Sequence, residues 1–183
     1  MTISFAGQFL LAMPGIGDSR FDAAAIFLCS HDSNGALGLD LGSLVPGLGL
    51  HGLMTGLGME AGQAPDLPVH LGGPVEPQRG FVLHGDDWRG DDTIDAGRLR
   101  LTGTLDVLRA MADGNGPRQA LVALGYAGWG AGQLDAEMSR HGWFAAPADD
   151  TLLFDTRAPS RWAAAYRNAG VDPRFLAPAA GNA

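Results

Sequence analysis

Three side chains with reactive chemistry lie close together in the sequence, namely Cys29, His31 and Asp32. Residues i and i+2 of an extended strand share a face, so the His31 imidazole could lower the thiol pKa of Cys29. Such a pair would support nucleophilic or redox chemistry. A lone cysteine at the end of an apolar strand is more often a small buried side chain, and this structural interpretation is favoured.

A second candidate site is a glycine-rich segment that follows the apolar run at 120–124 and precedes a predicted helix over 133–140. Its glycines are Gly125, Gly128, Gly130 and Gly132. Backbone N–H groups in this context can bind a phosphate. Their spacing matches neither the dinucleotide-binding motif nor the P-loop. A tight strand-to-helix turn with Trp129 packed beneath it is therefore favoured over anion binding.

A third candidate is the loop that begins with Gly72 and Gly73 and is followed by Arg79. This loop could bind a carboxylate or a partner peptide, although Gly and Pro together more commonly make a tight turn. His70 and His84 each end an apolar strand and could line a shared cleft. Histidines at strand ends that bond to the backbone are the commoner case.

The metal-binding patterns of the sequence are weak. The five histidines include no HExxH motif, and a single cysteine excludes a cysteine-rich zinc site. The acidic loop at 86–92 lacks the spacing of a calcium-binding EF-hand. The sequence thus predicts no metal and no cofactor.

Composition excludes several classes of protein. The 183 residues carry 20 acidic and 12 basic side chains, a net charge of -8, and the scattered basic residues are all arginine. This acidic chain lacks the positive surface on which nucleic-acid affinity depends, so direct nucleic-acid binding is not expected. No apolar run is long enough for a membrane span. The single cysteine and the absence of a basic N-terminal region favour the cytoplasm.

Apolar runs and turn signals predict alternating strands and helices. We expect strands at 8–13, 24–29, 36–39, 69–71, 80–84, 98–101 and 120–124, with a hairpin turn at Asn34-Gly35. Helices are expected at 50–59, after a cap at Thr104, and at 133–140 and 160–169. This alternation favours a mixed sheet covered by helices. The length predicts a single domain over 1–176, followed by a flexible tail at 177–183.

Four blocks of the sequence resemble the signature blocks of the bacterial YqgE/AlgH family. They are residues 7–14, 27–31 with 35–38, 71–75 with 79–84, and 125–134. The segments 153–155, 161–162 and 170–172 resemble the C-terminal end of that family, so the resemblance covers about residues 7–176. The chain departs from the family pattern at 39–42, where members more often carry an Asn followed by a basic residue and Pro.

The resemblance implies an α/β (α+β) domain with a mixed, partly barrel-like sheet flanked by helices. Members are largely uncharacterised, are often described as transcriptional regulators, and owe one name to a proposed role in alginate production. The favoured function is a non-enzymatic regulatory or binding protein that acts through an unidentified protein or small ligand. The alternative is a small-molecule or redox-responsive enzyme that uses Cys29 and the Gly125–Gly132 segment.

Overall fold

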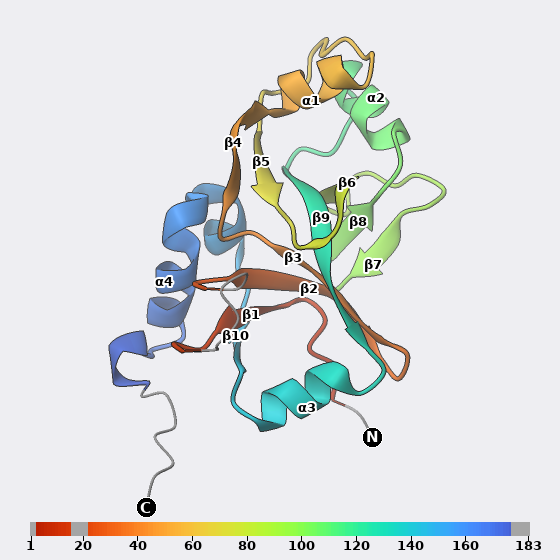
Figure 1. Ribbon diagram of the computed structural model, residues 1–183. Helices are drawn as coiled ribbons and strands as arrows, with labels where there is room; N and C mark the ends of the chain where they lie inside the picture. The colour runs from red at the N-terminus through yellow and green to blue at the C-terminus, as the bar shows by residue number, and fades with distance from the viewer. Residues whose placement is uncertain (1–2, 16–21, 177–183) are drawn as a thin grey trace, which may run out of the picture.

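The apolar runs of the sequence form the strands of one curled sheet (Figure 1). The computed structural model describes residues 3–15 and 22–176. Its strands are β1 (Gln8–Ala12), β2 (Ala25–Asp32), β3 (Gly35–Asp40), β4 (Leu44–Gly49), β5 (Pro68–Leu71), β6 (Val75–His84), β7 (Ile94–Ala96), β8 (Leu99–Thr102), β9 (Ala120–Gly130) and β10 (Trp143–Pro147). Its helical elements are α1 (Leu50–Gly56), α2 (Asp106–Ala112), α3 (Gln133–Ser139), the π-helical turn η2 (Thr151–Asp155), α4 (Ala158–Asn168) and the 3-10 turn η3 (Pro173–Phe175).

Strand β9 organises the sheet. The strand order is β10-β1-β2-β3-β9-β6-β8-β7, and β5 also pairs with β9 while β4 pairs only with β5. The β5–β9 pair is parallel, whereas the other pairs are antiparallel. Strand β2 also contacts β7 from the far end of the order without pairing with it, so the sheet is curled into a partial barrel. This confirms the expected mixed, partly barrel-like sheet flanked by helices.

Both faces of the sheet are covered, which explains the unbroken apolar run in β1. Phe9 and Leu11 pack in a buried cluster with residues of α4, while Leu10 and Ala12 pack in a second cluster with Leu134 of α3. A strand with two buried faces reads as continuously apolar rather than alternating. Helices α1 and α2 cover a third cluster at the upper end of the molecule in Figure 1.

Two glycines let three strands meet where β9 changes neighbours. Residues 122–124 of β9 pair with β5, and residues 127–130 pair with β3. Between them, the Gly72 N–H donates to the Leu124 carbonyl at 2.8 Å, and the Gly72 carbonyl accepts from the Asp40 N–H at 2.7 Å. A Cβ on Gly72 would lie 2.1 Å from the carbonyl oxygen of Gly125. Only glycine fits this backbone contact.

The structure corrects the predicted glycine-rich turn. Gly125, Gly128 and Gly130 belong to β9, which continues past the expected end at 124, and only Gly132 (φ 69°) stands at the start of α3. Gly125 accommodates this continuation with a φ of 74°. Local composition predicts a turn here, but pairing with β3 and β6 keeps the chain extended.

Other predicted elements differ more modestly. Strands β4, β7 and β10 were not expected, and the helix predicted at 50–59 ends earlier as α1. The Thr104 hydroxyl does not cap a helix; it donates to the Asp106 carboxylate at 2.5 Å. Strand β6 begins at Val75 and not at the expected residue 80, so Arg79 lies in this strand and not beside a loop. Strands β1, β2, β3, β5 and β8 and helices α3 and α4 confirm the predictions within a few residues. The predicted tail at 177–183 lies outside the described residues.

Substitution of Gly72 by alanine tests the packing at this junction. We expect Gly72→Ala to lower the free energy of unfolding by at least about 2 kcal/mol, because the added methyl group meets backbone rather than a movable side chain. Gly56→Ala is the matched control: nothing lies within 4 Å of its added Cβ, and alanine favours a helix. Urea denaturation measures both, and equal effects of the two substitutions would contradict the proposed steric role.

Candidate functional site

A cavity of about 410 Å³ lies between β4–β5, the start of β9 and the segment that joins η2 to α4. Its walls are mainly apolar and include Leu44, Leu67, Pro68, Leu121, Phe154 and Pro159. The polar residues that line it are His70, Asp155, Thr156, Arg157 and Arg161. A concave site of this size, with a few polar groups among apolar walls, is typical of small-molecule binding.

The buried side chain of Arg161 lies beneath the cavity. It is 2% exposed. Its Nε donates to the Leu152 carbonyl at 2.8 Å, and its Nη2 donates to the carbonyls of Leu153 at 2.9 Å and Thr156 at 2.7 Å. Its Nη1 donates to the Leu41 carbonyl. The π-helical turn thus directs successive carbonyls at one guanidinium, whose pKa burial lowers to about 10.

His70 accepts the remaining hydrogen bond of Arg161. Its Nδ1 lies 2.9 Å from the Val122 carbonyl and must donate to it, because a carbonyl oxygen only accepts. The Nε2 lone pair therefore faces Arg161 Nη1 at 3.0 Å. Burial and then the charge of Arg161 lower the His70 pKa to about 4, so the ring is neutral at pH 7. All five N–H bonds of the guanidinium have acceptors.

The carboxylate of Asp40 lies close enough to the Arg161 guanidinium for their charges to interact. Its Oδ1 accepts from the backbone N–H groups of Ala25 at 3.2 Å and Gly42 at 2.9 Å. Burial raises its pKa to about 6, and the two hydrogen bonds and the charge of Arg161 limit the rise. This is where the chain departs from the family pattern, and the side-chain oxygen of an asparagine could accept the same two bonds.

Two charged residues stand at the edge of the cavity. Asp155 and Arg157 contribute to its lining, and both residues are exposed. Within the described part of the chain, neither side chain has a hydrogen bond or an ion pair. Thr156 between them donates its hydroxyl to the Thr151 carbonyl at 2.8 Å. The cavity thus combines apolar walls, internally bonded polar groups and two available charges.

The structure does not bring Cys29 and His31 together as a catalytic pair. Cys29 is fully buried in the core, and burial raises its pKa far above the usual range of a thiol. A register shift in β2 between residues 28 and 30 interrupts the regular strand alternation. The His31 Nδ1 instead accepts from the Phe5 N–H at 3.3 Å, and its Nε2 lies 3.6 Å from the Asp135 carboxylate.

His70 and His84 do not share a cleft, because they lie on strands that flank opposite sides of β9. His84 is fully buried; its Nδ1 donates to the Gly85 carbonyl at 2.8 Å, and its Nε2 accepts from the Thr102 hydroxyl at 2.8 Å. The Thr102 hydroxyl in turn lies 2.8 Å from that of Thr93. These bonds hold the loop at 85–93 against β8.

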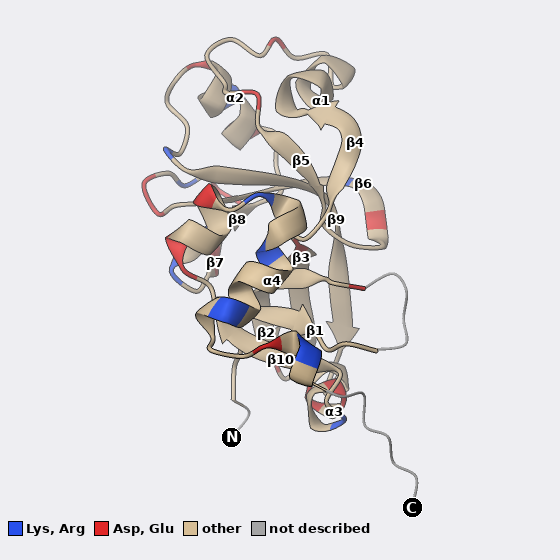
Figure 2. Ribbon diagram, turned by 90° about the vertical axis from the view of Figure 1, so that its left-hand side faces the viewer, with Lys and Arg blue, Asp and Glu red and all other residues tan. Residues whose placement is uncertain are grey.

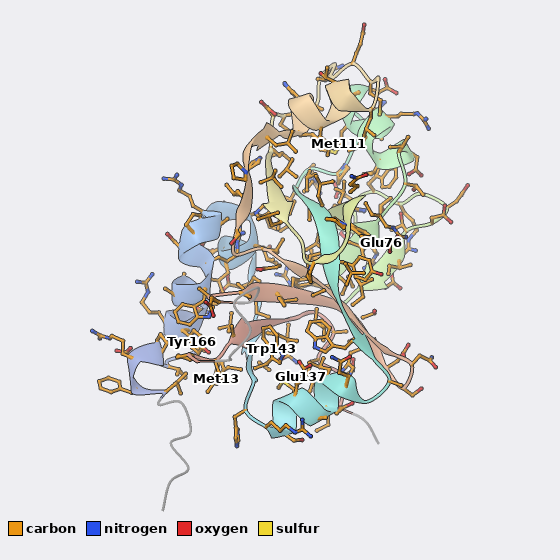
Figure 3. All side chains as sticks on the ribbon, in the orientation of Figure 1. Met13, Glu76, Met111, Glu137, Trp143 and Tyr166 are labelled. Carbon is orange, nitrogen blue, oxygen red and sulfur yellow. The ribbon has the colours of Figure 1, made fainter. Side chains whose placement is uncertain are left out.

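The remaining candidate residues lie away from the cavity. Arg79 pairs with Glu76 at 3.3 Å, with its guanidinium carbon 5.0 Å from the centre of the Phe81 ring. The indole N–H groups of Trp129 and Trp143 both donate to one carboxylate oxygen of Glu137, at 2.9 and 2.8 Å (Figure 3). Trp129 therefore anchors α3. Gly72, Gly73, Gly128, Gly130 and Gly132 are absent from the lining of the cavity.

Sequence reasoning missed the cavity because its walls come from three distant segments. The available signal was the block that contains Arg161, since an arginine within an otherwise apolar helix face needs buried acceptors. Within residues 3–15 and 22–176, no group of three or more His, Cys, Asp or Glu could hold a metal ion. No helix of this part of the chain is long and apolar enough to cross a membrane.

The accessibility of Cys29 can be measured by alkylation. We expect iodoacetamide at neutral pH to label the folded protein at least about tenfold more slowly than free cysteine, because the thiol is buried and protonated. Protein unfolded in urea is the control and should label at the rate of free cysteine. Fast labelling of the folded protein would restore the reactive-cysteine hypothesis.

Asp40→Asn tests the buried carboxylate. Because the folded-state pKa of about 6 exceeds the ordinary value of 3.8, ionisation of Asp40 costs stability as the pH rises from about 4 to 6. The amide keeps the two backbone hydrogen bonds without the charge. We expect the stability gained by Asp40→Asn to be about 2 kcal/mol larger at pH 7.5 than at pH 4.5. Urea denaturation at both pH values measures this difference, and a gain independent of pH would contradict it.

Comparison with known proteins identifies the family of this chain. Residues 9–174 match the AlgH-like protein family. A UPF0301 protein of Rhizorhabdus wittichii is 59% identical, over 98% of this chain and 97% of its own length. A UPF0301 protein of Novosphingobium aromaticivorans is 51% identical, over 97% of this chain and 96% of its own length.

Solved structures agree with this match. The solution structure of the AlgH protein from Pseudomonas aeruginosa is 36% identical, has a TM-score of 0.80 and covers 100% of this chain and 98% of that chain. A Corynebacterium diphtheriae protein of known crystal structure, 21% identical with a TM-score of 0.71 over 92% of this chain and 88% of that chain, shares the fold. The chain therefore belongs to the AlgH-like family, as the sequence blocks indicated.

Proposed function

We propose that this chain is a non-enzymatic binding protein that takes a small, mainly apolar ligand in the cavity between β4–β5, β9 and the start of α4. The observation that carries the proposal is the cavity itself, about 410 Å³ with apolar walls. Burial of a ligand's apolar surface contributes roughly 25 cal/mol per Å² removed from water. A small molecule can therefore gain affinity here by burying apolar surface, without forming a hydrogen bond to the polar groups beneath the cavity.

The chemistry around the cavity supports binding rather than catalysis. A catalytic site needs a nucleophile or base with a free lone pair, held near the reacting atoms. At the buried end of the cavity, the Nε2 lone pair of His70 already accepts from Arg161, and the donors of Arg161 are all engaged. The carboxylate of Asp155 is free, but this residue is exposed at the cavity edge, and no side chain of the described residues is hydrogen-bonded to it as a catalytic partner. Cys29 lies in the core and not in the cavity lining. The polar groups beneath the cavity hold its walls in place.

The distribution of charge argues against direct nucleic-acid binding. Figure 2 shows the arginines scattered among acidic residues. Several are paired with acids, including Arg98 with Asp150 at 2.5 Å and Arg118 with Asp87 at 3.1 Å. Paired arginines contribute little positive potential toward phosphates. In a regulatory role, the protein would bind a protein partner differently with and without its ligand. We place this role in the cytoplasm, where the unpaired Cys29 stays reduced.

Small apolar probes test the cavity directly. We expect indole and 1-hexanol at millimolar concentration to shift the amide resonances of residues 67, 69–70, 120–121 and 154–158 in two-dimensional NMR spectra, in a saturable way. Leu44→Trp should fill the cavity and abolish these shifts, because the half-buried Leu44 forms one wall. Leu105→Trp is the control, since Leu105 is exposed and lies outside the cavity lining. Shifts that are absent, or that survive Leu44→Trp, would overturn the proposal.

A further inference from the structure

The cavity has one end that offers no free hydrogen-bonding group and one end that carries two opposite charges. The inner end is formed by Arg161 and His70, and the outer end by Asp155 and Arg157. Building on the proposed function, we propose that the ligand is a free α-amino acid with an apolar side chain. The side chain enters the cavity, and the ammonium and carboxylate groups remain at its edge.

The inner end requires an apolar group. The guanidinium of Arg161 donates to four backbone carbonyls and to His70, and the second nitrogen of His70 donates to the Val122 carbonyl. No buried side-chain nitrogen or oxygen of the described residues lacks a partner. A polar ligand group at this end would therefore lose its bonds to water without replacement, at a cost of about 1–3 kcal/mol. A hydrocarbon or aromatic group incurs no such cost.

The outer end places a carboxylate and a guanidinium on one side of the chain. Thr156 (φ -100°, ψ 130°) and Arg157 (φ -67°, ψ 143°) are both extended. In extended backbone the side chains of residues i and i+2 point the same way, and their Cα atoms are about 7 Å apart. Asp155 and Arg157 thus share a side, while the Thr156 hydroxyl bonds back to the Thr151 carbonyl. The ammonium and carboxylate groups of an amino acid would each have an oppositely charged partner on this side.

A zwitterion suits this pair better than a single charge does. Asp155 would repel an anion at the cavity edge, and Arg157 would repel a cation. A zwitterion meets both residues favourably, and the protein's net charge of -8 does not oppose a ligand of zero net charge. The first turn of α4 carries no acidic residue, so the ligand carboxylate is also placed favourably near that helix terminus.

Calorimetry with matched ligands tests the inference. We expect L-leucine, L-phenylalanine or L-tryptophan to bind in a saturable way to the full chain. N-acetyl-L-leucine lacks the ammonium group and L-leucinamide lacks the carboxylate, so each should bind at least about tenfold more weakly than L-leucine. Glycine, which lacks the apolar group, should not bind. Equal affinity for L-leucine and either derivative would overturn the inference.

Variants assign the two head-group contacts. Arg157→Gln and Asp155→Asn should each weaken L-leucine binding about tenfold and weaken indole binding far less, because indole has neither an ammonium nor a carboxylate group to pair with these charges. Arg167→Gln, an exposed arginine of α4 outside the cavity lining, should change neither. If indole binds but the amino acids do not, this inference fails and the proposed function stands. If neither binds, the proposed function fails as well.

Discussion

The guanidinium of Arg161 is the interaction on which the rest of the structure depends. It forms hydrogen bonds to the π-helical turn, to the chain after β3 and to strand β5. Its contact with the Leu41 carbonyl joins residues that are 120 positions apart in the sequence. Removal of a buried hydrogen-bonded charge leaves its partners unsatisfied, which is far more costly than the loss of an exposed ion pair. This side chain therefore helps to fix the position of α4 relative to the sheet, together with Trp162 and Tyr166.

Strand β9 imposes the second constraint. Residues 122–124 lie between β5 and β6, and residues 127–130 pair with β3, so one continuous strand joins the two parts of the sheet. The exchange of neighbours requires close backbone approach, which Gly72 and Gly125 permit. The start of β9 also supplies Ala120 and Leu121 to the cavity. The close backbone contact between Gly72 and Gly125 and the proposed ligand site therefore both depend on strand β9.

The predictable part of the fold was the part that local sequence determines. Apolar runs such as 24–29 form strands because they are buried on both sides, and α4 has Pro159 in its first turn and is followed by Gly170 with a φ of 74°. Strand β4 was not predictable from its own residues, because Pro46 and Gly47 are typical of turns; pairing with β5 at Leu44 and Gly49 makes the segment a strand, with an irregularity between these residues where Gly47 has a φ of 70°. The Gly125–Gly130 segment is extended for the same reason.

The candidate site was less accessible to sequence reasoning. The favoured interpretation of Cys29 as a buried side chain agrees with its place in the core, because a thiol among apolar neighbours needs no partner. The cavity could not be predicted, since no local pattern shows that residues near 44, 68, 120 and 157 converge. His70 illustrates the difference: its position at a strand end was evident, but its tautomer follows from two partners far away in the sequence.

The pairing of β1 with β10 has a consequence for synthesis on the ribosome. Strand β1 pairs along its whole length with β10, and the Ala12 carbonyl at its end accepts from Trp162 at 3.0 Å and Tyr166 at 3.1 Å. Strand β1 is thus translated about 150 residues before these partners. Because chains emerge at about 5–20 residues per second, about 8–30 s separate the synthesis of β1 from that of these partners. Native burial of both faces of β1 is therefore completed only late in the synthesis of the chain.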